Sequence, residues 1–312
     1  MEQVSIFEYT MPTFKIDKPI RLIELFAGIG SQAKALERLG ANFEHWKAVE
    51  FDKYAMASYN AVHGTHFEVS DIRDIHATDL EIRERESYCY IMTYSFPCQD
   101  LSLAGHGKGM SKGSGTRSGL LWEVERILDE CDELPQVLLM ENVPPVIGKY
   151  IDDFLLWRKK LESFGYSNYV ELLNAKDYGI PQSRNRCFMV SILGEYYYSF
   201  PKKIPLKLKL KDMLEDEVDE KYYLSNKTIE SFLAHRERQE EKGNGFKFEP
   251  LEREREISRT ITGKSGQRDT DNYIYSDSTC TRILSGESGT DRDSDHDRCR
   301  SRGEMAHLGG YP

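Results

Sequence analysis

Short apolar segments alternate with amphipathic segments along the first 193 residues, and this alternation restricts the fold more than any other feature of the chain. Four apolar runs have the length and composition of buried strands, at 20–28, 45–52, 86–95 and 135–142. Segments with apolar side chains at helical spacing separate them, at 31–40, 53–64 and 118–130. Strands that alternate with helices are typical of parallel βαβ units. We therefore predict an α/β fold with a doubly wound, Rossmann-like sheet.

The alternation continues with a helix at 150–165 and strands at 168–175 and 186–193, and it fades near residue 195. From there to residue 257 the chain is rich in Lys and Glu, with one weak helical pattern at 226–241, which indicates a second, smaller module. The segment 283–312 is almost free of large apolar residues. It therefore cannot bury much surface, and we expect a disordered or atypical tail.

Overall composition narrows the class of protein. The net charge of -10 argues mildly against a nucleic-acid partner, although positive charges cluster at 181–187 and 201–211. The chain start lacks the pattern of a signal peptide, and no run reaches the roughly 18 apolar residues of a membrane span. The six cysteines lack Cys-x-x-Cys spacing, so we expect reduced thiols in a cytoplasmic protein, with neither disulfides nor a metal site.

A glycine loop follows the first strand. Gly28 and Gly30 stand between a strand and a helix, where a backbone can approach a bound nucleotide closely, although Ala33 replaces the third glycine of the dinucleotide pattern. A plain tight turn fits the same residues. Glu50 lies 20 residues after Gly30 at the end of the second strand, where a carboxylate can accept hydrogen bonds from ribose hydroxyls. A solvated surface acid is the alternative for Glu50.

Two further positions fit an adenine base. Phe51 could cover one face of the base, or it could belong to the core. Asp71 and Ile72 could hold the edge of the base, or Asp71 could cap a helix. Because the glycine loop is short and has no Lys, it cannot form the phosphate cradle of a P-loop. S-adenosylmethionine, which has no phosphates, therefore fits better than a nucleoside triphosphate.

The stretch YIMTYSFPCQDLSLAG places Cys98 just beyond the third strand, in a loop that Pro97 restricts. A free cysteine is often a small core residue. The end of a strand in an open α/β sheet is, however, where ligands bind, so a nucleophile is the competing interpretation.

The motifs FAGIGS, VEFD, SDI, FPCQDLS, MENV and IPQSRNRCF follow one another in an order and spacing that resemble the DNA (cytosine-5)-methyltransferase family. The likeness covers residues 20–193, and the chain is similar to short members borne by phages or prophages. The resemblance implies a methyltransferase sheet, S-adenosylmethionine as cofactor, and methylation of carbon 5 of a cytosine that is flipped out of double-stranded DNA.

The resemblance also implies catalytic roles. Cys98 matches the nucleophile that adds to ring carbon 6, which requires nearby positive charge or a helix dipole to favour the thiolate. Glu141 matches the acid at ring nitrogen 3, and Arg186 the contact with the cytosine carbonyl. Four supporting residues shape or brace the Cys98 loop: Pro97, Gln99, Asn142 and Arg184.

Binding residues follow from the same likeness. Ten positions are expected around the cofactor: Phe26, Ala27, Gly28, Gly30, Glu50, Phe51, Asp71, Ile72, Pro97 and Leu120. Lys108, Lys112 and Arg117 belong to the glycine-rich segment 104–119, which closes over DNA in the family and could otherwise be a plain flexible linker. Gln182 is expected to contact DNA.

The resemblance divides the chain into an S-adenosylmethionine-binding catalytic domain (1–193), a small target-recognition region (194–258), a return segment (259–282) and the tail (283–312). The family normally ends with a segment that carries Gly-Asn-Ser and completes the cofactor pocket, and we find no such segment. A catalytically defective relative that binds DNA without turnover is therefore a competing hypothesis.

A nucleotide-dependent oxidoreductase is a third hypothesis for the function of the chain. It would explain the glycine loop and Glu50 but not Cys98, Glu141 and Arg186. Within the methyltransferase hypothesis, transfer RNA is a possible substrate, because one branch of the family uses it. The sequence leaves open a cognate restriction endonuclease as partner, a monomeric state and the recognised DNA sequence.

Overall fold

The computed structural model describes residues 11–101, 108–215, 219, 223–243, 248–252, 254–261, 272–274 and 283–284. The chain forms two compact units. Unit 1 comprises Met1–Leu173 and Asn185–Pro201, and unit 2 comprises Asn174–Arg184 and Lys202–Pro312. The domain boundaries expected from the sequence, at residues 193, 258 and 282, stay predictions.

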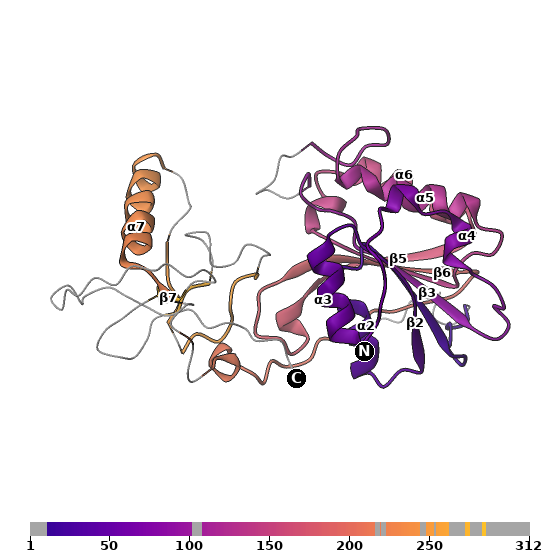
Figure 1. The fold of residues 1–312 in the computed structure, drawn as a ribbon, viewed down its shortest axis with the longest axis horizontal. Helices are drawn as coiled ribbons and strands as arrows, with labels where there is room; N and C mark the ends of the chain where they lie inside the picture. Colours follow the sequence, from indigo (N-terminus) through magenta and orange to yellow (C-terminus); the bar gives the residue numbers. More distant parts are fainter. Residues whose placement is uncertain are drawn as a thin grey trace, which may run out of the picture. The chain divides into compact units, whose positions relative to one another are not determined.

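Unit 1 is built on a six-stranded sheet with the order β2-β1-β3-β4-β6-β5 (Figure 1). The strands are β1 Ile20–Leu25, β2 Phe43–Val49, β3 Cys89–Tyr94, β4 Val137–Asn142, β5 Tyr166–Asn174 and β6 Asn185–Leu193. The β1–β2, β1–β3 and β3–β4 pairs are parallel. Because these pairs are parallel, the carboxyl ends of β1 to β4 share one edge of the sheet, where open α/β sheets bind ligands.

Strand β6 is antiparallel to β4, with Glu141 opposite Phe188 and Asn142 opposite Cys187. The β5–β6 connection contains only a short 3-10 turn, η4 Ala175–Asp177, rather than a crossover helix. A crossover helix is what normally joins parallel strands. The predicted alternation of strands and helices therefore holds up to β5. The last strand, β6, follows without a crossover helix and runs antiparallel to β4.

Helices cover both faces of the sheet. The α-helices of unit 1 are α2 Ser31–Arg38, α3 Lys53–His63, α4 Ala77–Leu80, α5 Leu121–Glu130 and α6 Ile151–Ser163, with 3-10 turns η1 Ile72–Asp74, η2 Ser118–Leu120 and η3 Pro144–Ile147. Helices α4, α5 and α6 lie along one face (Figure 1), and α2 and α3 pack on the other. This is the doubly wound arrangement that the sequence predicts. Among the described residues, none of the helices combines the length and apolar composition of a membrane crossing.

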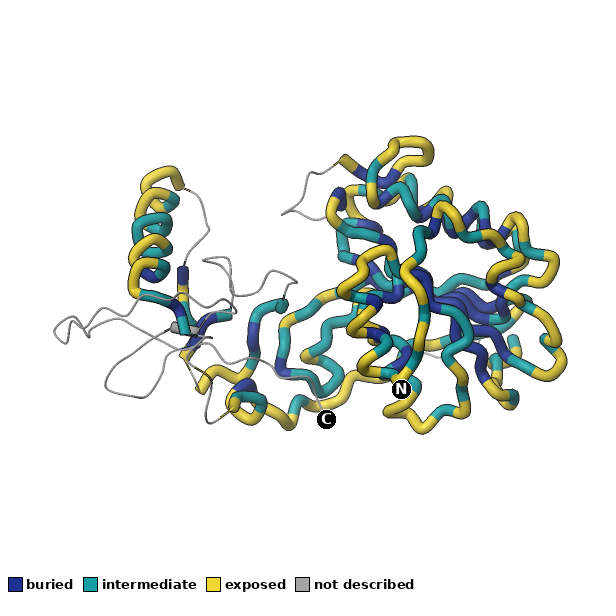
Figure 2. Tube along the Cα trace, in the orientation of Figure 1, coloured by how far each residue is buried: buried dark blue, intermediate teal, exposed yellow. Residues whose placement is uncertain are grey.

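The central strands are buried on both sides, as their continuous apolar sequence requires (Figure 2). Ile23 and Leu25 of β1 pack toward α5 and α6, whereas Leu22 packs toward α2. The fully buried Trp157 of α6 donates its indole N–H to the Tyr94 hydroxyl at 3.1 Å. Burying such large side chains contributes about 1.5–3 kcal/mol each, so this packing stabilises the sheet.

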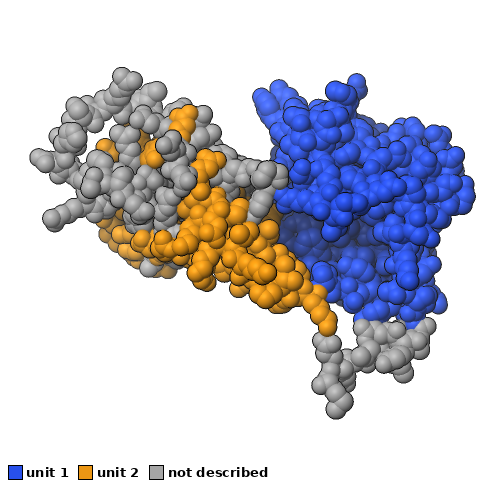
Figure 3. Space-filling model, turned by 90° about the horizontal axis from the view of Figure 1, so that it is seen from below, with its two compact units in different colours: residues 1–173, 185–201 blue, residues 174–184, 202–312 orange. Residues whose placement is uncertain are grey.

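Unit 2, which is coloured orange in Figure 3, has less regular structure among its described residues. Its elements are η4, η5 Leu210–Met213, α7 Asn226–Glu241 and the antiparallel pair β7 Tyr223–Leu224 and β8 Ile283–Leu284. The Ser225 hydroxyl caps α7 by accepting the Thr228 N–H. Three mutually contacting aromatic rings, Phe232, Phe248 and Tyr273, form a small core beneath the helix.

Five segments with sequence-based expectations fall wholly or partly outside the described residues. These are the chain start at 1–10, the first part of the loop at 104–119, parts of the expected target-recognition region at 194–258, most of the return segment at 259–282, and the tail beyond Leu284.

Gly30 is the glycine whose replacement should cost most. It caps α2 with φ +80°, and a Cβ there would lie 2.2 Å from Nε2 of His63 and 2.8 Å from the Tyr59 ring. The left-handed conformation alone costs a non-glycine residue about 1–2 kcal/mol, and overpacking adds about 1–3 kcal/mol. We expect Gly30→Ala to lower the free energy of unfolding by about 2–5 kcal/mol in urea denaturation.

Gly40→Ala is the matched control, because Gly40 has φ +65° and open space where the Cβ would stand. It should lose only the conformational part, about 1–2 kcal/mol. Equal losses in the two variants would contradict the close packing of His63 on the loop.

Candidate active site

The Cys98 loop leaves the carboxyl end of β3 and is tied to the end of β4. The side-chain amide of Asn142, which is buried, donates to the Phe96 carbonyl at 3.0 Å, and its oxygen accepts the Val143 N–H at 2.8 Å. The Ser118 hydroxyl donates to the Pro97 carbonyl at 2.6 Å. The two carbonyl groups before Cys98 therefore accept hydrogen bonds from two different elements, β4 and η2. These bonds fix the backbone that carries the half-buried Cys98.

A second set of bonds holds the loop beyond Cys98. The buried Asp100 accepts the Ser118 N–H on its carboxylate at 3.2 Å. Its carbonyl accepts the Gly109 N–H and the Tyr150 hydroxyl, both at 3.2 Å. Leu101 N–H bonds back to the Cys98 carbonyl at 3.0 Å, which closes a turn around the cysteine. The loop is thus an ordered structure with buried polar partners.

Glu141 and Arg186 form an ion pair at the same edge of the sheet. Nε of Arg186 lies 2.9 Å from Oε1 of Glu141, and the two side chains are 16% and 22% exposed. Nη1 of Arg186 also donates to the Asn185 carbonyl at 2.8 Å. In the β3–β4 register Tyr94 is opposite Met140, so Glu141, the next residue of β4, lies beside the start of the Cys98 loop. The fold therefore brings a thiol, a carboxyl group and a guanidinium to neighbouring strand ends.

The glycine loop follows β1, and three of its residues have positive φ angles. Phe26, Gly28 and Gly30 have φ values of 58°, 57° and 80°. For Phe26 this conformation is strained by about 1–2 kcal/mol. Ala27 N–H donates to the Val49 carbonyl, and Gly28 N–H donates to Oε2 of Glu50 at 2.8 Å.

Glu50 therefore buttresses the loop from the end of β2. Its other oxygen accepts the Asp52 N–H at 2.8 Å. Each carboxylate oxygen has a further acceptor site, so hydrogen bonds with ribose hydroxyls remain compatible with this arrangement.

The other residues predicted for cofactor binding differ in exposure. Phe51 and Ile29 are 70% and 57% exposed, which is unusual for large apolar residues beside a structured loop, and a Cβ at Gly28 would meet nothing within 4 Å. Phe51 is thus not a core residue. Asp71 is the N-cap of η1 and bonds Arg73, whose guanidinium lowers the pKa of the Asp71 carboxyl group. Ile72 is buried in the core and Leu120 precedes α5.

The family described as C-5 cytosine-specific DNA methylase matches residues 20–312. The chain belongs to this family. The match confirms the family and the enzyme class that the motifs predict, and it continues beyond residue 193, where the recognisable motifs end.

Individual relatives agree. The chain is 44% identical over 187 residues to the orphan methyltransferase M.SssI of Spiroplasma monobiae, an alignment that covers 58% of this chain and 46% of that protein. It is 35% identical over 263 residues to the type II methyltransferase M2.ScrFI of Lactococcus lactis subsp. cremoris, with 67% and 71% covered. The chain thus spans about half the length of the first relative and over two thirds of the second.

A solved structure shows the same fold. The Dnmt2 methyltransferase of S. pombe superposes with a TM-score of 0.60 at 21% identity, over 78% of this chain and 71% of the other. This likeness supports the Rossmann-like methyltransferase sheet.

Two of the residues predicted for DNA contact bond other side chains of this family member. Nζ of Lys112 lies 2.8 Å from Oε2 of Glu125, and Arg117 donates to Oε1 of Gln99 at 2.8 Å. Lys108 is exposed. Closure of the segment over DNA stays a prediction.

The Gln-x-Arg-x-Arg motif is shared between the two units. Arg186 belongs to unit 1, whereas Gln182 and Arg184 belong to unit 2. Within unit 2, Oε1 of Gln182 accepts the Ile261 N–H at 3.4 Å, and Nη1 of Arg184 donates to the Ile261 carbonyl at 3.3 Å. The support of the Cys98 loop by Arg184 and the contact of Gln182 with DNA stay predictions.

The sequence analysis does not identify two buried residues behind the glycine loop. Glu24 is fully buried in β1 and accepts the Tyr59 hydroxyl at 2.6 Å and the Ala33 N–H at 3.3 Å. Burial raises the pKa of the Glu24 carboxyl group and of the Tyr59 phenol. A charged residue inside an apolar strand was the available signal, because such a residue is rarely buried without partners.

The four described cysteines, Cys89, Cys98, Cys131 and Cys187, are free thiols. Desolvation raises the pKa of Cys89 and Cys131 to about 11 and that of Cys187 to about 12. These three thiols therefore stay protonated near neutral pH, and only the thiolate is an effective nucleophile.

We expect iodoacetamide near neutral pH to alkylate Cys98 well before Cys89, Cys131 and Cys187, as measured by peptide mass spectrometry. Because the pKa values of those three thiols are raised, their alkylation should increase only as pH rises toward 11. Faster labelling of any of the three than of Cys98 in the folded protein would contradict this interpretation. Peptide mapping also distinguishes labelling of these four cysteines from labelling of Cys280 and Cys299, which lie outside the described residues.

Asn142→Asp should loosen the Cys98 loop, because a carboxylate oxygen would face the Phe96 carbonyl where the amide now donates. An unsatisfied buried group costs about 1–3 kcal/mol, so the free energy of unfolding should fall by that amount and Cys98 alkylation should change in rate. Asn60→Asp breaks a similar amide bond to the Phe67 carbonyl, far along the chain from the loop. It should leave Cys98 alkylation unchanged, and equal effects of the two variants on labelling would refute the bracing role.

Proposed function

We propose that this chain transfers a methyl group from S-adenosylmethionine to carbon 5 of a flipped cytosine in DNA, through a covalent bond between Cys98 and the base. The observation that carries the proposal is the bond from the Asn142 amide to the Phe96 carbonyl, 3.0 Å long. It ties the loop of the candidate nucleophile to the residue next to Glu141.

Cytosine does not react with methyl donors at carbon 5 unless electron density is supplied to the ring. Addition of the Cys98 thiolate to carbon 6 forms a carbon–sulfur bond and moves the ring double-bond electrons toward carbon 5. S-adenosylmethionine supplies an electrophilic methyl group on a sulfonium. After methylation, loss of the proton from carbon 5 and departure of the thiolate restore the aromatic base.

Glu141 and Arg186 suit the charge that the addition creates. A protonated carboxyl group next to ring nitrogen 3 can hold or deliver a proton there, and proton transfer of this kind contributes about 10²–10⁴-fold in rate. The guanidinium of Arg186 has five N–H donors. Its bonds to Glu141 and Asn185 therefore leave donors for the carbonyl of the base.

The glycine loop suits the adenosine part of the cofactor. Gly28 faces open space, Glu50 stands at the end of β2, and the exposed side chains of Phe51 and Ile29 gain cover when a flat base lies on them. Phe26, Ala27 and Gly30 would shape the loop, Asp71 and Ile72 would meet the base edge, and Pro97 and Leu120 would border the methyl group.

The competing hypotheses are less well supported. A DNA-binding relative without turnover is not favoured, because the family match runs from residue 20 to residue 312. An oxidoreductase leaves the Glu141–Arg186 pair without a role. Type II methyltransferases among the relatives support a restriction–modification setting, and the companion endonuclease stays a prediction.

DNA with 5-fluorocytosine at the target position should trap the chain covalently, because fluorine at carbon 5 cannot leave as a proton does. We expect a denaturant-resistant complex in the presence of S-adenosylmethionine, none with Cys98→Ala, and an undiminished one with Cys131→Ala. Bisulfite sequencing of DNA from cells that express the chain identifies the target to use. Parallel assays on duplex DNA and transfer RNA distinguish the two substrates.

Glu141→Gln should bind S-adenosylmethionine normally and slow methyl transfer by about 10²–10⁴-fold. Glu123→Gln, on the surface of α5, is the control and should retain full activity. Full activity of Glu141→Gln would remove the proton-transfer role, and a folded, cofactor-bound wild type without adduct or methylation would overturn the proposed function.

A further inference from the structure

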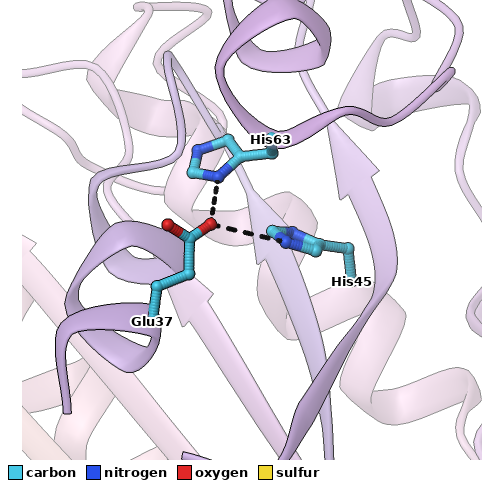
Figure 4. A group of neighbouring side chains, drawn as sticks. All are labelled: Glu37, His45 and His63. Carbon is cyan, nitrogen blue, oxygen red and sulfur yellow. Dashed lines mark hydrogen bonds and ion pairs between the residues drawn. The ribbon is translucent and has the colours of Figure 1, made fainter. Parts of the chain in front are cut away.

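Three side chains from three elements of unit 1 converge beside the glycine loop (Figure 4). They are Glu37 of α2, His45 of β2 and His63, the last residue of α3. One ligand atom from each lies within 4.8 Å of the others, and this is the one such group of three among the described residues. No spacing in the sequence points to it, because the three residues meet only after β1 and β2 pair and the two helices pack.

The spacing is close to that of a metal site. Oε1 of Glu37 lies 2.8 Å from Nδ1 of His63 and 3.9 Å from Nε2 of His45. Ligands at about 2.0–2.2 Å from a tetrahedral zinc ion are about 3.3 Å apart. The two observed distances lie on either side of that value, and the two histidine nitrogens lie within 4.8 Å of each other, so side-chain shifts of about one ångström would bring the three atoms to coordination spacing.

Both imidazoles have the outer hydrogen bonds that metal-binding histidines use. Nε2 of His63 lies 3.2 Å from the Ile29 carbonyl, which can only accept. Nδ1 of His45 lies 2.9 Å from the Tyr59 hydroxyl, and that hydroxyl donates its own proton to Glu24 at 2.6 Å. Each ring can therefore carry a proton on its outer nitrogen. The inner nitrogen of His63 donates to Oε1 of Glu37 at 2.8 Å, because a carboxylate only accepts, and a bound metal ion would replace that inner proton. Such outer bonds fix the tautomer of a metal ligand.

Glu37 offers one oxygen to the cluster. Its Oε2 is paired with Nζ of Lys34 at 2.8 Å, which leaves Oε1 for the two histidines. The His63 side chain is fully buried, whereas those of His45 and Glu37 are 18% and 32% exposed, so an ion could enter from the Glu37 side and keep a water as its fourth ligand.

We propose that Glu37, His45 and His63 bind one divalent transition-metal ion of the zinc class, which fastens α2, α3 and β2 together behind the glycine loop. Imidazole with carboxylate is a donor set that zinc and its neighbours accept and that calcium and magnesium do not prefer. The site does not depend on methyl transfer, and its failure would leave the proposed function untouched.

An ordinary ion pair is the competing explanation, and the chain contains one for comparison. His76 lies 3.1 Å from Oε2 of Glu130 without a second histidine beside it among the described residues. His76→Gln is therefore a matched control for the loss of a histidine–glutamate contact.

The test uses the full chain, freed of metal by a chelator, and cobalt(II) as the probe. We expect one cobalt ion per chain, with the visible absorption of a tetrahedral nitrogen and oxygen site and no thiolate charge-transfer band. Zinc should displace it. Affinity should fall at least tenfold in Glu37→Gln and in His45→Gln and stay unchanged in His76→Gln, with circular dichroism as the check on folding.

Glu37 lies on the exposed face of α2, so its replacement should leave the fold intact even if that of His45 does not. Absence of cobalt binding by the wild type would overturn the proposal. So would a Glu37→Gln variant that binds cobalt as tightly as the wild type does.

Discussion

The hydrogen bond from the Asn142 amide to the Phe96 carbonyl is the contact on which the geometry of the candidate active site depends. Parallel pairing brings the ends of β3 and β4 to one edge of the sheet, but it does not fix the loops that follow. The buried amide does so by joining the last residue of β4 to the loop after β3. Within unit 1, Cys98 and Glu141 are then held at the same edge of the sheet, because each is one or two residues away from the joined groups.

The glycine loop is stabilised from behind in a comparable way. Strained backbone at Phe26 and the positive φ values of the glycines persist because Glu50 holds the Gly28 N–H while Glu24, Tyr59 and His63 fill the space beneath. Buried polar groups of this kind are costly unless every partner is present. Their bonds therefore define one conformation of the loop rather than add much net stability.

The sequence predicts the parts of this protein that depend on local pattern. Apolar runs and helical spacing locate β1 to β6 and the main helices to within a few residues, and the family motifs locate Cys98, Glu141 and Arg186 at strand ends. It does not predict the antiparallel β6, because strand direction depends on the connection and not on composition. Nor does it predict Asp100, Ser118 and Tyr150 as partners of the Cys98 loop, since such residues are recognised only by the backbone groups they meet.

Ser183 and Ser258 lie far apart in the sequence but are joined through the backbone, with Ser183 N–H donating to the Ser258 carbonyl and Ser258 N–H donating to that of Pro181. Asn174–Arg184 consequently folds with the later part of the chain, although it is inserted between two strands of the sheet. In a chimaera that takes unit 2 from a relative, a graft that began only at Lys202 would leave Asn174–Arg184 from one parent against later residues from the other. Recombination between relatives should therefore exchange both segments of unit 2 together, Asn174–Arg184 and the chain from Lys202 onward.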